Sequence, residues 1–200
     1  MATIRARAMT LEEFLALPEE KPALEFAHGR IERKVPPVHV HAVLQAVLTT
    51  LINEYGWRAR RALASTELRV VLGGCMRVPD ISVYRWERIP RDSQGRIRGE
   101  PVTAPPDLIV EIVSPGQSVN GQIARCIDLL SAGVRVALLI DPDDESVVIL
   151  RPDAAAQIVR GSERIALEDV LPGFELSAEA VFAALTDPDG PPRAPRSETS

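Results

Sequence analysis

The sequence predicts an α/β domain in which a mixed central β-sheet is flanked by helices. Its 200 residues, 46% hydrophobic and 26% charged, suffice for one well-filled domain of ordinary composition. Stretches with the 3.6-residue period of helices alternate along the chain with short apolar runs rich in β-branched residues. The clearest run is 108–113, which prolines bracket on both sides, as expected of a short buried strand.

Apolar periodicity and turn residues place the other elements in order. A capping box at Thr10 opens a short helix over 11–17, and Gly29 divides 24–33 into a hairpin or a bent strand. Longer helices are expected over 39–55 and 122–131, and a last one over 178–185. The remaining strands are expected over 57–64, 67–72, 76–84, 134–140, 146–150, 157–159 and 164–166.

The domain is expected to span 10–185, with a flexible N-terminus over 1–9 and a disordered tail over 186–200. Residues 85–105 mix charge, Gly and Pro and are expected to form a long exposed loop. No apolar run approaches the ~20 residues that cross a bilayer. The first eight residues are followed by no apolar segment of a signal peptide. We therefore expect a cytoplasmic protein that does not engage membranes.

Charge and cysteine usage narrow the function only slightly. Cys75 and Cys126 have no metal-like spacing and need be no more than small buried hydrophobic residues. The net charge of −5 argues against a large non-specific nucleic-acid surface but leaves a local basic patch open. Arginines gather after the long helix and in the 85–105 loop, where they could contact phosphates or simply face solvent: Arg58, Arg60, Arg61, Arg85, Arg88, Arg91, Arg96 and Arg98.

Three carboxylates stand in apolar strand contexts. Glu111 interrupts the buried run 108–113, and Asp80 and Glu25 likewise have apolar neighbours in expected strands. A single strand acid usually faces solvent or an ion pair, and a buried carboxylate is costly unless it is paired, hydrogen-bonded or metal-bound. Acids converging from separate elements suit Mg²⁺, which takes one or two carboxylates and keeps waters. Such an ion can activate water and neutralise charge on a phosphodiester.

Several pieces of sequence around these acids carry a family resemblance: Leu24-Glu25-Phe26 with Gly29, His41 at the start of the long helix, Arg77-Val78-Pro79-Asp80-Ile81, the run from Pro105 to Pro115, and Ala132-Gly133-Val134 leading to Ile140-Asp141-Pro142. Over roughly 10–185 the chain resembles the Uma2 family, whose fold is that of the PD-(D/E)XK, restriction-endonuclease-like nucleases. The resemblance implies a Mg²⁺-dependent (or Mn²⁺-dependent) endonuclease that hydrolyses nucleic acid, with DNA as the expected substrate.

The resemblance also implies roles for single residues. Asp80 and Glu111 would hold the metal, Glu25 would be an additional acid that binds metal or orients water, and His41 would be an accessory group. For His41, a structural hydrogen bond at the start of a helix is an equally weighted alternative.

The chain departs from the family pattern at one central position. Arg125 stands where the family carries the signature lysine, and Asn120 and Gly121 occupy the turn where an acid usually precedes it. Arginine keeps the positive charge, but its planar fork and very high pKa make it a poor replacement for an ammonium. A further departure is Ala137-Leu138, where the family commonly shows an aromatic pair.

Three interpretations therefore stay open. One is an active nuclease in which Arg125 stabilises the charged intermediate. Another is a catalytically inactive protein that binds nucleic acid or a protein partner through the same groove. The third is a structural network of ion pairs without a ligand. A homodimer is compatible with each, because edge strands and apolar helix faces are common dimer surfaces.

Overall fold

The computed structural model describes residues 9–97 and 101–186, which fold into two β-sheets and four α-helices. Apart from Met9 and Thr186, the expected flexible N-terminus and disordered tail lie outside the described residues. The larger sheet is mixed and has the strand order β10-β9-β8-β7-β6-β3. Its strands are β3 (Ala62–Thr66), β6 (Ile81–Arg85), β7 (Leu108–Ile112), β8 (Val136–Asp141), β9 (Ser146–Leu150) and β10 (Gln157–Arg160). Of these six strands only β7 and β8 pair in parallel, and the prediction of a mixed central sheet is confirmed.

A second, smaller sheet is antiparallel and has the order β2-β1-β5-β4. Its strands are β1 (Leu24–Ala27), β2 (Arg30–Arg33), β4 (Val70–Leu72) and β5 (Cys75–Arg77). Strands β1 and β2 form the hairpin that the sequence left as one of two options. Its two turn residues, His28 (φ 52°) and Gly29 (φ 74°), both adopt the left-handed conformation that tight two-residue hairpins require.

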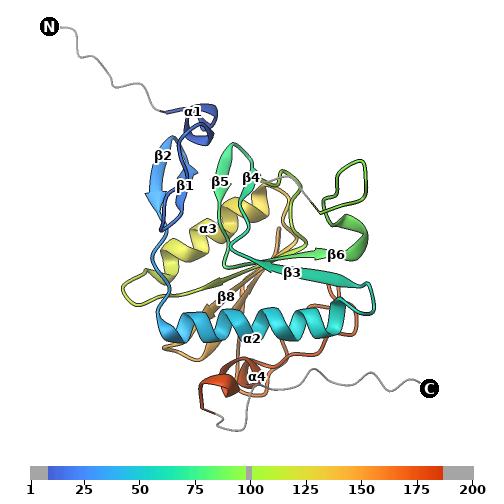
Figure 1. The fold of residues 1–200 in the computed structure, drawn as a ribbon. Coiled ribbons are helices and arrows are strands. Elements are labelled where there is room, and N and C mark those ends of the chain that lie inside the picture. The colour runs from blue at the N-terminus through green and yellow to red at the C-terminus, as the bar shows by residue number, and fades with distance from the viewer. Residues whose placement is uncertain (1–8, 98–100, 187–200) are drawn as a thin grey trace, which may run out of the picture.

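Helices cover both faces of the larger sheet. They are α1 (Leu11–Leu15), α2 (His39–Gly56), α3 (Val119–Ser131) and α4 (Ala178–Phe182), with short 3₁₀ turns η1 (Trp86–Arg88) and η2 (Ala183–Leu185). In Figure 1, α2 runs across the lower front with α4 beneath it, and the small sheet stands above with α1 at its top. Residues from α2 and α4 share one hydrophobic core with the sheet, and residues from α3 share another.

The alternation of side chains along β7 decides where its acid points. Val110 and Ile112 pack into the core on the α2 side, whereas Ile109 and Val113 pack into the core on the α3 side. Because successive side chains of a strand face opposite ways, Glu111 belongs to the α3 face. The carboxylate is thus directed toward the helix that carries Arg125.

The expected single strand over 76–84 is wrong in one respect, because it is broken in two. β5 ends at Arg77 in the small sheet, and β6 begins at Ile81 in the larger one. Pro79 lies in the break and has no N–H to donate to a strand ladder, which favours an interruption there. The break places Asp80 at the junction of the two sheets.

Other boundaries differ from the sequence prediction for local reasons. The strand expected from residue 57 begins only at Ala62, because 57–60 form a turn after α2 that includes Arg60 in a left-handed conformation (φ 51°). The strand expected over 67–72 begins at Val70. Residues 164–166 form no strand but a single bridge between Arg164 and Ser177. Helix α3 starts at Val119, earlier than expected, because Ser118 Oγ accepts a hydrogen bond from the Gly121 N–H (3.4 Å). Helices α1 and α4 end sooner than expected, α4 passing into the η2 turn.

The 85–105 segment is in part less exposed than predicted. It contains η1, and Ile89 and Val102 are buried in the core on the α3 side. The Val71 N–H donates to the Val102 carbonyl (2.8 Å), which ties the segment to β4. Buried backbone groups need such partners, and the stretches around Ile89 and Val102 therefore follow the sheet, whereas 93–97 are exposed as predicted.

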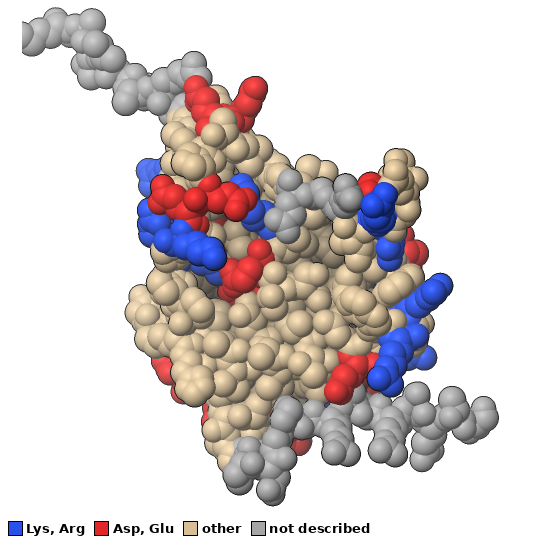
Figure 2. All heavy atoms as spheres, in the orientation of Figure 1, with Lys and Arg blue, Asp and Glu red and all other residues tan. Residues whose placement is uncertain are grey.

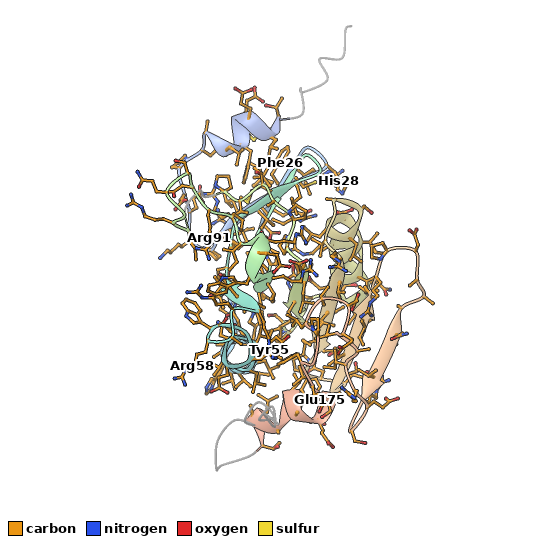
Figure 3. All side chains as sticks on the ribbon, turned by 90° about the vertical axis from the view of Figure 1, so that its right-hand side faces the viewer. Phe26, His28, Tyr55, Arg58, Arg91 and Glu175 are labelled. Carbon is orange, nitrogen blue, oxygen red and sulfur yellow. The ribbon has the colours of Figure 1, made fainter. Side chains whose placement is uncertain are left out.

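A third, small core joins α1 to the small sheet. The rings of Phe14 and Phe26 are stacked with centroids 5.3 Å apart, and Figure 3 shows Phe26 beneath α1. Because Phe26 follows Glu25 in β1, this packing fixes the strand that carries one of the predicted site acids. Within the ranges 9–97 and 101–186, no helix is long and apolar enough to cross a membrane.

Candidate functional site

A cavity of about 470 Å³ opens between the small sheet, the start of α2 and the first turns of α3. Its lining brings together four residues that the sequence singled out: His41, Asp80, Glu111 and Arg125. The fifth, Glu25, lies directly behind Arg125. Figure 2 shows acidic and basic side chains gathered over the small sheet, whereas the face over α2 carries little charge.

Asp80 is held as a carboxylate at the junction of the sheets. Its Oδ2 accepts the Ile112 N–H (2.7 Å), and its Oδ1 lies 2.8 Å from Lys34 Nζ and 3.2 Å from His41 Nε2. Burial alone would raise the pKa of Asp80, but the hydrogen bond with His41 and the charge of Lys34 outweigh it and keep the pKa below its ordinary value. The side chain is therefore negatively charged near neutral pH.

Glu111 has the opposite character. Burial raises its pKa to about 8, and the negative charge of Asp80 adds to the rise. Its Oε1 is buried without a hydrogen-bond partner among the described residues, and Arg125 Nη2 lies 3.6 Å away. A buried acceptor without a hydrogen bond is costly, so this oxygen is suited to receive a cation or a proton.

Glu25 and Arg125 form an ion pair with two hydrogen bonds. Arg125 Nη1 and Nη2 both donate to the Glu25 carboxylate, the second over 2.9 Å to Oε1. The Val78 N–H (2.8 Å) and Arg77 Nη1 (3.3 Å) donate to the same carboxylate. Burial would raise the pKa of Glu25, but these donors, Arg125 first among them, lower it. Glu25, which the resemblance implied would bind metal or orient water, thus has both carboxylate oxygens engaged by protein donors.

His41 combines the two roles that the sequence left open. Its Nδ1 is hydrogen-bonded to Ser114 Oγ (3.0 Å), which is the structural bond expected at a helix start. Its Nε2 faces Asp80 Oδ1, so the ring also belongs to the site. The Ser114-Pro115 motif after β7 thus orients the histidine.

The acids fit a metal held by few protein ligands. Within the part of the chain that the structure describes, no group of three or more His, Cys, Asp or Glu side chains is arranged as a metal cage. Mg²⁺ needs no such cage, since one or two carboxylates and several waters satisfy it. The hard oxygen atoms of Asp80 and Glu111 match that requirement, and Glu111 Oε1 accepts no hydrogen bond from the described residues.

Sequence patterns did not identify Lys34, which follows the end of β2 and contacts the site. Its Nζ contacts Asp80, donates to the Val78 carbonyl (2.9 Å) and meets both carboxylate oxygens of Glu67. Burial would lower the pKa of Lys34, but the charges of Asp80, Glu111 and Glu67 raise it above its ordinary value. One signal was available: the chain has only two lysines, Lys21 and Lys34, among 23 basic residues.

A belt of ion pairs that the sequence also missed joins the small sheet to α3. Arg77 Nη1 lies 2.7 Å from Glu32 Oε2, and its Nη2 lies 3.4 Å from Asp128 Oδ2. His28 Nε2 approaches the same Asp128 oxygen (3.0 Å), and Figure 3 shows His28 at the hairpin turn beside the helix. No apolar pattern marks these residues, because their partners come from distant parts of the chain.

Several arginines expected as a phosphate-contacting arm have structural partners instead. Asp107 is fully buried, pairs with Arg88, and has Arg85 Nε 3.6 Å from its Oδ1. The guanidinium of Arg91 lies over the Trp86 ring at 5.5 Å. These contacts tie the start of the 85–105 segment to the sheet and leave these three arginines less available for nucleic acid.

Comparison with known proteins agrees with this architecture. The sequence profile of the Uma2 family, described as "Putative restriction endonuclease", matches residues 11–179. The chain is similar to a crystal structure described as "a putative nuclease belonging to DUF820" from Anabaena variabilis ATCC 29413. The two share 34% identity with a TM-score of 0.82 over 88% of this chain and 98% of that one. No curated protein matches the sequence. The match in sequence and fold spans most of the domain, and the chain therefore belongs to the Uma2 family of restriction-endonuclease-like proteins.

Proposed function

We propose that this protein is a divalent-metal-dependent endonuclease that hydrolyses phosphodiester bonds of nucleic acid, with DNA as the substrate. The observation that carries the proposal is that an ionised Asp80 and a Glu111 oxygen without a hydrogen bond from the described residues line one cavity, beside Lys34 and Arg125. The family and its structural neighbour, both described as nucleases, support the same class of reaction.

In this proposal Asp80 and Glu111 hold Mg²⁺ or Mn²⁺. When bound, such an ion neutralises charge on the phosphodiester and makes water a better nucleophile. Water loses a proton to solvent as its oxygen adds to phosphorus, the bond to the leaving oxygen breaks, and the leaving oxygen takes up a proton from solvent. Arg125, held by Glu25, contributes positive charge near Glu111 while negative charge builds on the phosphate. His41 holds Asp80 in position through its contact with Oδ1.

The alternative is a catalytically inactive member that binds nucleic acid or a protein partner through this groove. One observation favours it: both terminal nitrogens of Arg125, at the signature lysine position, are directed at Glu25. A guanidinium held in this way reaches a phosphate only at the expense of its buried pair. The third interpretation, a purely structural network, predicts that Asp80 and Glu111 bind no divalent ion.

A cleavage assay with four proteins separates these functions. Wild type, Asp80→Ala, Arg125→Lys and the control Glu179→Ala are incubated with supercoiled DNA, single-stranded DNA or RNA, each with Mg²⁺ or Mn²⁺. Glu179 is an exposed acid on α4, outside the cavity. We expect the wild type and Glu179→Ala to cut DNA and Asp80→Ala to be inactive.

Other outcomes favour the alternatives. An inactive wild type, with cutting by Arg125→Lys, would identify a binding protein silenced at one position. Unchanged binding of divalent ions by Asp80→Ala in calorimetry would show that Asp80 is not a metal ligand.

A homodimer stays a prediction, which sedimentation equilibrium of the wild type would test.

A further inference from the structure

We propose that Lys34 supplies the ammonium of the active site, in place of the signature lysine whose position Arg125 occupies. This inference rests on the proposed nuclease function. The chain uses arginine almost everywhere, and one of its only two lysines is the one whose Nζ contacts the candidate metal ligand Asp80.

Lys34 is placed by the fold and not by a neighbouring motif. It follows β2 directly, and its side chain is only 12% exposed on the wall of the cavity that Asp80 and Glu111 also line. An ammonium so far from water is costly unless oxygen atoms surround it. Asp80 Oδ1, the Val78 carbonyl and the Glu67 carboxylate supply them, at 2.8 to 2.9 Å.

The partners of the two cations differ in a way that assigns their roles. Arg125 is tied to Glu25, whose side chain is 1% exposed. Lys34 has as its outermost partner Glu67, whose side chain is 45% exposed at the protein surface. Glu67 can turn toward solvent, and a phosphate oxygen in its place would still satisfy the ammonium, so Lys34 can exchange Glu67 for a phosphate while it stays beside Asp80.

The chemistry of the two side chains points the same way. A lysine ammonium is a compact point charge on a flexible stem, whereas arginine binds best as a planar fork on a carboxylate. The ammonium of Lys34 is therefore placed to stabilise the negative charge that builds on the phosphate oxygens as water attacks. Arg125 holds Glu25 and, with it, the β1 strand against α3.

The test compares Lys34→Met, Arg125→Lys, the double variant, and Lys21→Met as the matched control. Lys21, the other lysine, is exposed and outside the lining of this cavity. For each protein we would measure DNA cleavage, Mn²⁺ binding by calorimetry and the midpoint of thermal unfolding. We expect Lys34→Met to keep Mn²⁺ binding and to cut ~100-fold more slowly, as on removal of one transition-state contact.

The double variant Lys34→Met/Arg125→Lys distinguishes a catalytic role of Lys34 from a structural one. A lysine at position 125 should recover most of the cleavage that Lys34→Met loses, because it returns an ammonium to the family position. A purely structural role of Lys34 would not be rescued in this way. Lys21→Met should cut like the wild type. Should Lys34→Met fail to fold, Lys34→Arg keeps the charge and is expected to bind Mn²⁺ normally but to cut more slowly.

Each contrary outcome has a distinct meaning. Wild-type cleavage by Lys34→Met or Lys34→Arg, with Asp80→Ala inactive, would overturn the role of Lys34 and leave the nuclease function standing. Slow cleavage that the double variant does not recover, or that accompanies lost Mn²⁺ binding, would show a structural partner of Asp80 and overturn the inference. A wild type that cuts no substrate would overturn the nuclease function and this inference together.

Discussion

Arg125 and Glu25 lie 100 residues apart in the chain and meet as a two-point pair behind the candidate metal site. Arg125 Nη2 donates to Glu25 Oε1 over 2.9 Å while Nη1 donates to the other carboxylate oxygen. This pairing gives a physical reason for an arginine at this position, because only its planar fork satisfies both oxygens at once. The substitution trades a free ammonium for a fixed link between β1 and α3.

Replacing Arg125 by lysine should therefore lower stability even though the charge is kept. A single ammonium satisfies the two Glu25 oxygens less well, and we expect Arg125→Lys to lose about 1–3 kcal/mol in the free energy of unfolding, measured in urea. The matched control is Arg164→Lys, whose surface pair with Glu175 is 66% and 58% exposed. It should change stability by less than about 0.5 kcal/mol. Equal effects in both variants would refute a special role for the two-point pair.

The buried Glu111 should make stability depend on pH. In the unfolded chain this carboxyl ionises near its ordinary pKa of 4.5, whereas in the folded protein burial raises the pKa to about 8. Between these values the folded state binds the extra proton, so the free energy of unfolding contributed by Glu111 falls as pH rises. Above about pH 8 both states are ionised and the fall ends.

The comparison with Glu111→Gln isolates this effect. We expect the stability of the wild type relative to Glu111→Gln to decrease from about pH 5 to about pH 8, in urea titrations without divalent ions. Other titrating groups act on both proteins and largely cancel. A difference that stays constant, or that grows with pH, would mean that Glu111 is already ionised in the folded protein.

Asp107 is expected to be structural, although it stands in the same motif as Glu111. It is buried and accepts from the Arg85 N–H and from Arg88, while Arg135 lies 3.6 Å away. Asp107→Asn should lower the free energy of unfolding by about 2–3 kcal/mol, because it leaves the partner arginines of a buried carboxylate without their counter-charge. The arginines are partly exposed, so solvent reduces this cost. It should still bind Mn²⁺ in calorimetry. Asp169→Asn, which breaks the more exposed pair with Arg151, should cost less than about 1 kcal/mol.

Gly56 at the end of α2 permits a close approach that no other residue would allow. A Cβ there would lie 2.5 Å from the Ala62 carbonyl oxygen, which is backbone and cannot swing away. We expect Gly56→Ala to cost about 1–3 kcal/mol in thermal or urea unfolding. In contrast, a Cβ added at Gly121 in α3 would lie 3.7 Å from Ser118 Cβ, an ordinary contact. Gly121→Ala should therefore raise the free energy of unfolding by about 0.5–1 kcal/mol. Destabilisation by both would point to helix effects other than the contact with Ala62.

Elements with a strong local pattern were predicted closely. The long helix was expected over 39–55 and spans His39–Gly56, and the buried strand was expected over 108–113 and spans Leu108–Ile112. Their periodicity is long or their ends are set by proline, so local sequence suffices. The run 76–84 failed because apolar character shows that residues are buried but not in which sheet. Its halves join different sheets at Pro79.

The candidate site divides in the same way. Their apolar sequence neighbours identified Glu25, Asp80 and Glu111 as unusual acids. His41 and Arg125 were identified from the family motif. All five lie at or directly behind one cavity. Lys34 and Arg77 carry no such mark, because a basic residue near a strand end is ordinary in sequence. Their contacts with Asp80, Glu25 and Glu32 arise only when the small sheet folds over α3.

The sequence by itself determined the α/β class, the family, and the acids that the core would have to tolerate, because burial and periodicity are local properties of the chain. Only the tertiary structure decided which cation each acid receives. Glu25 faces Arg125, Asp80 faces Lys34, and Glu111 Oε1 has no hydrogen-bond partner within the described residues. Pairing of charges depends on distances between segments far apart in sequence, and electrostatic energy changes steeply over a few ångströms in a buried site.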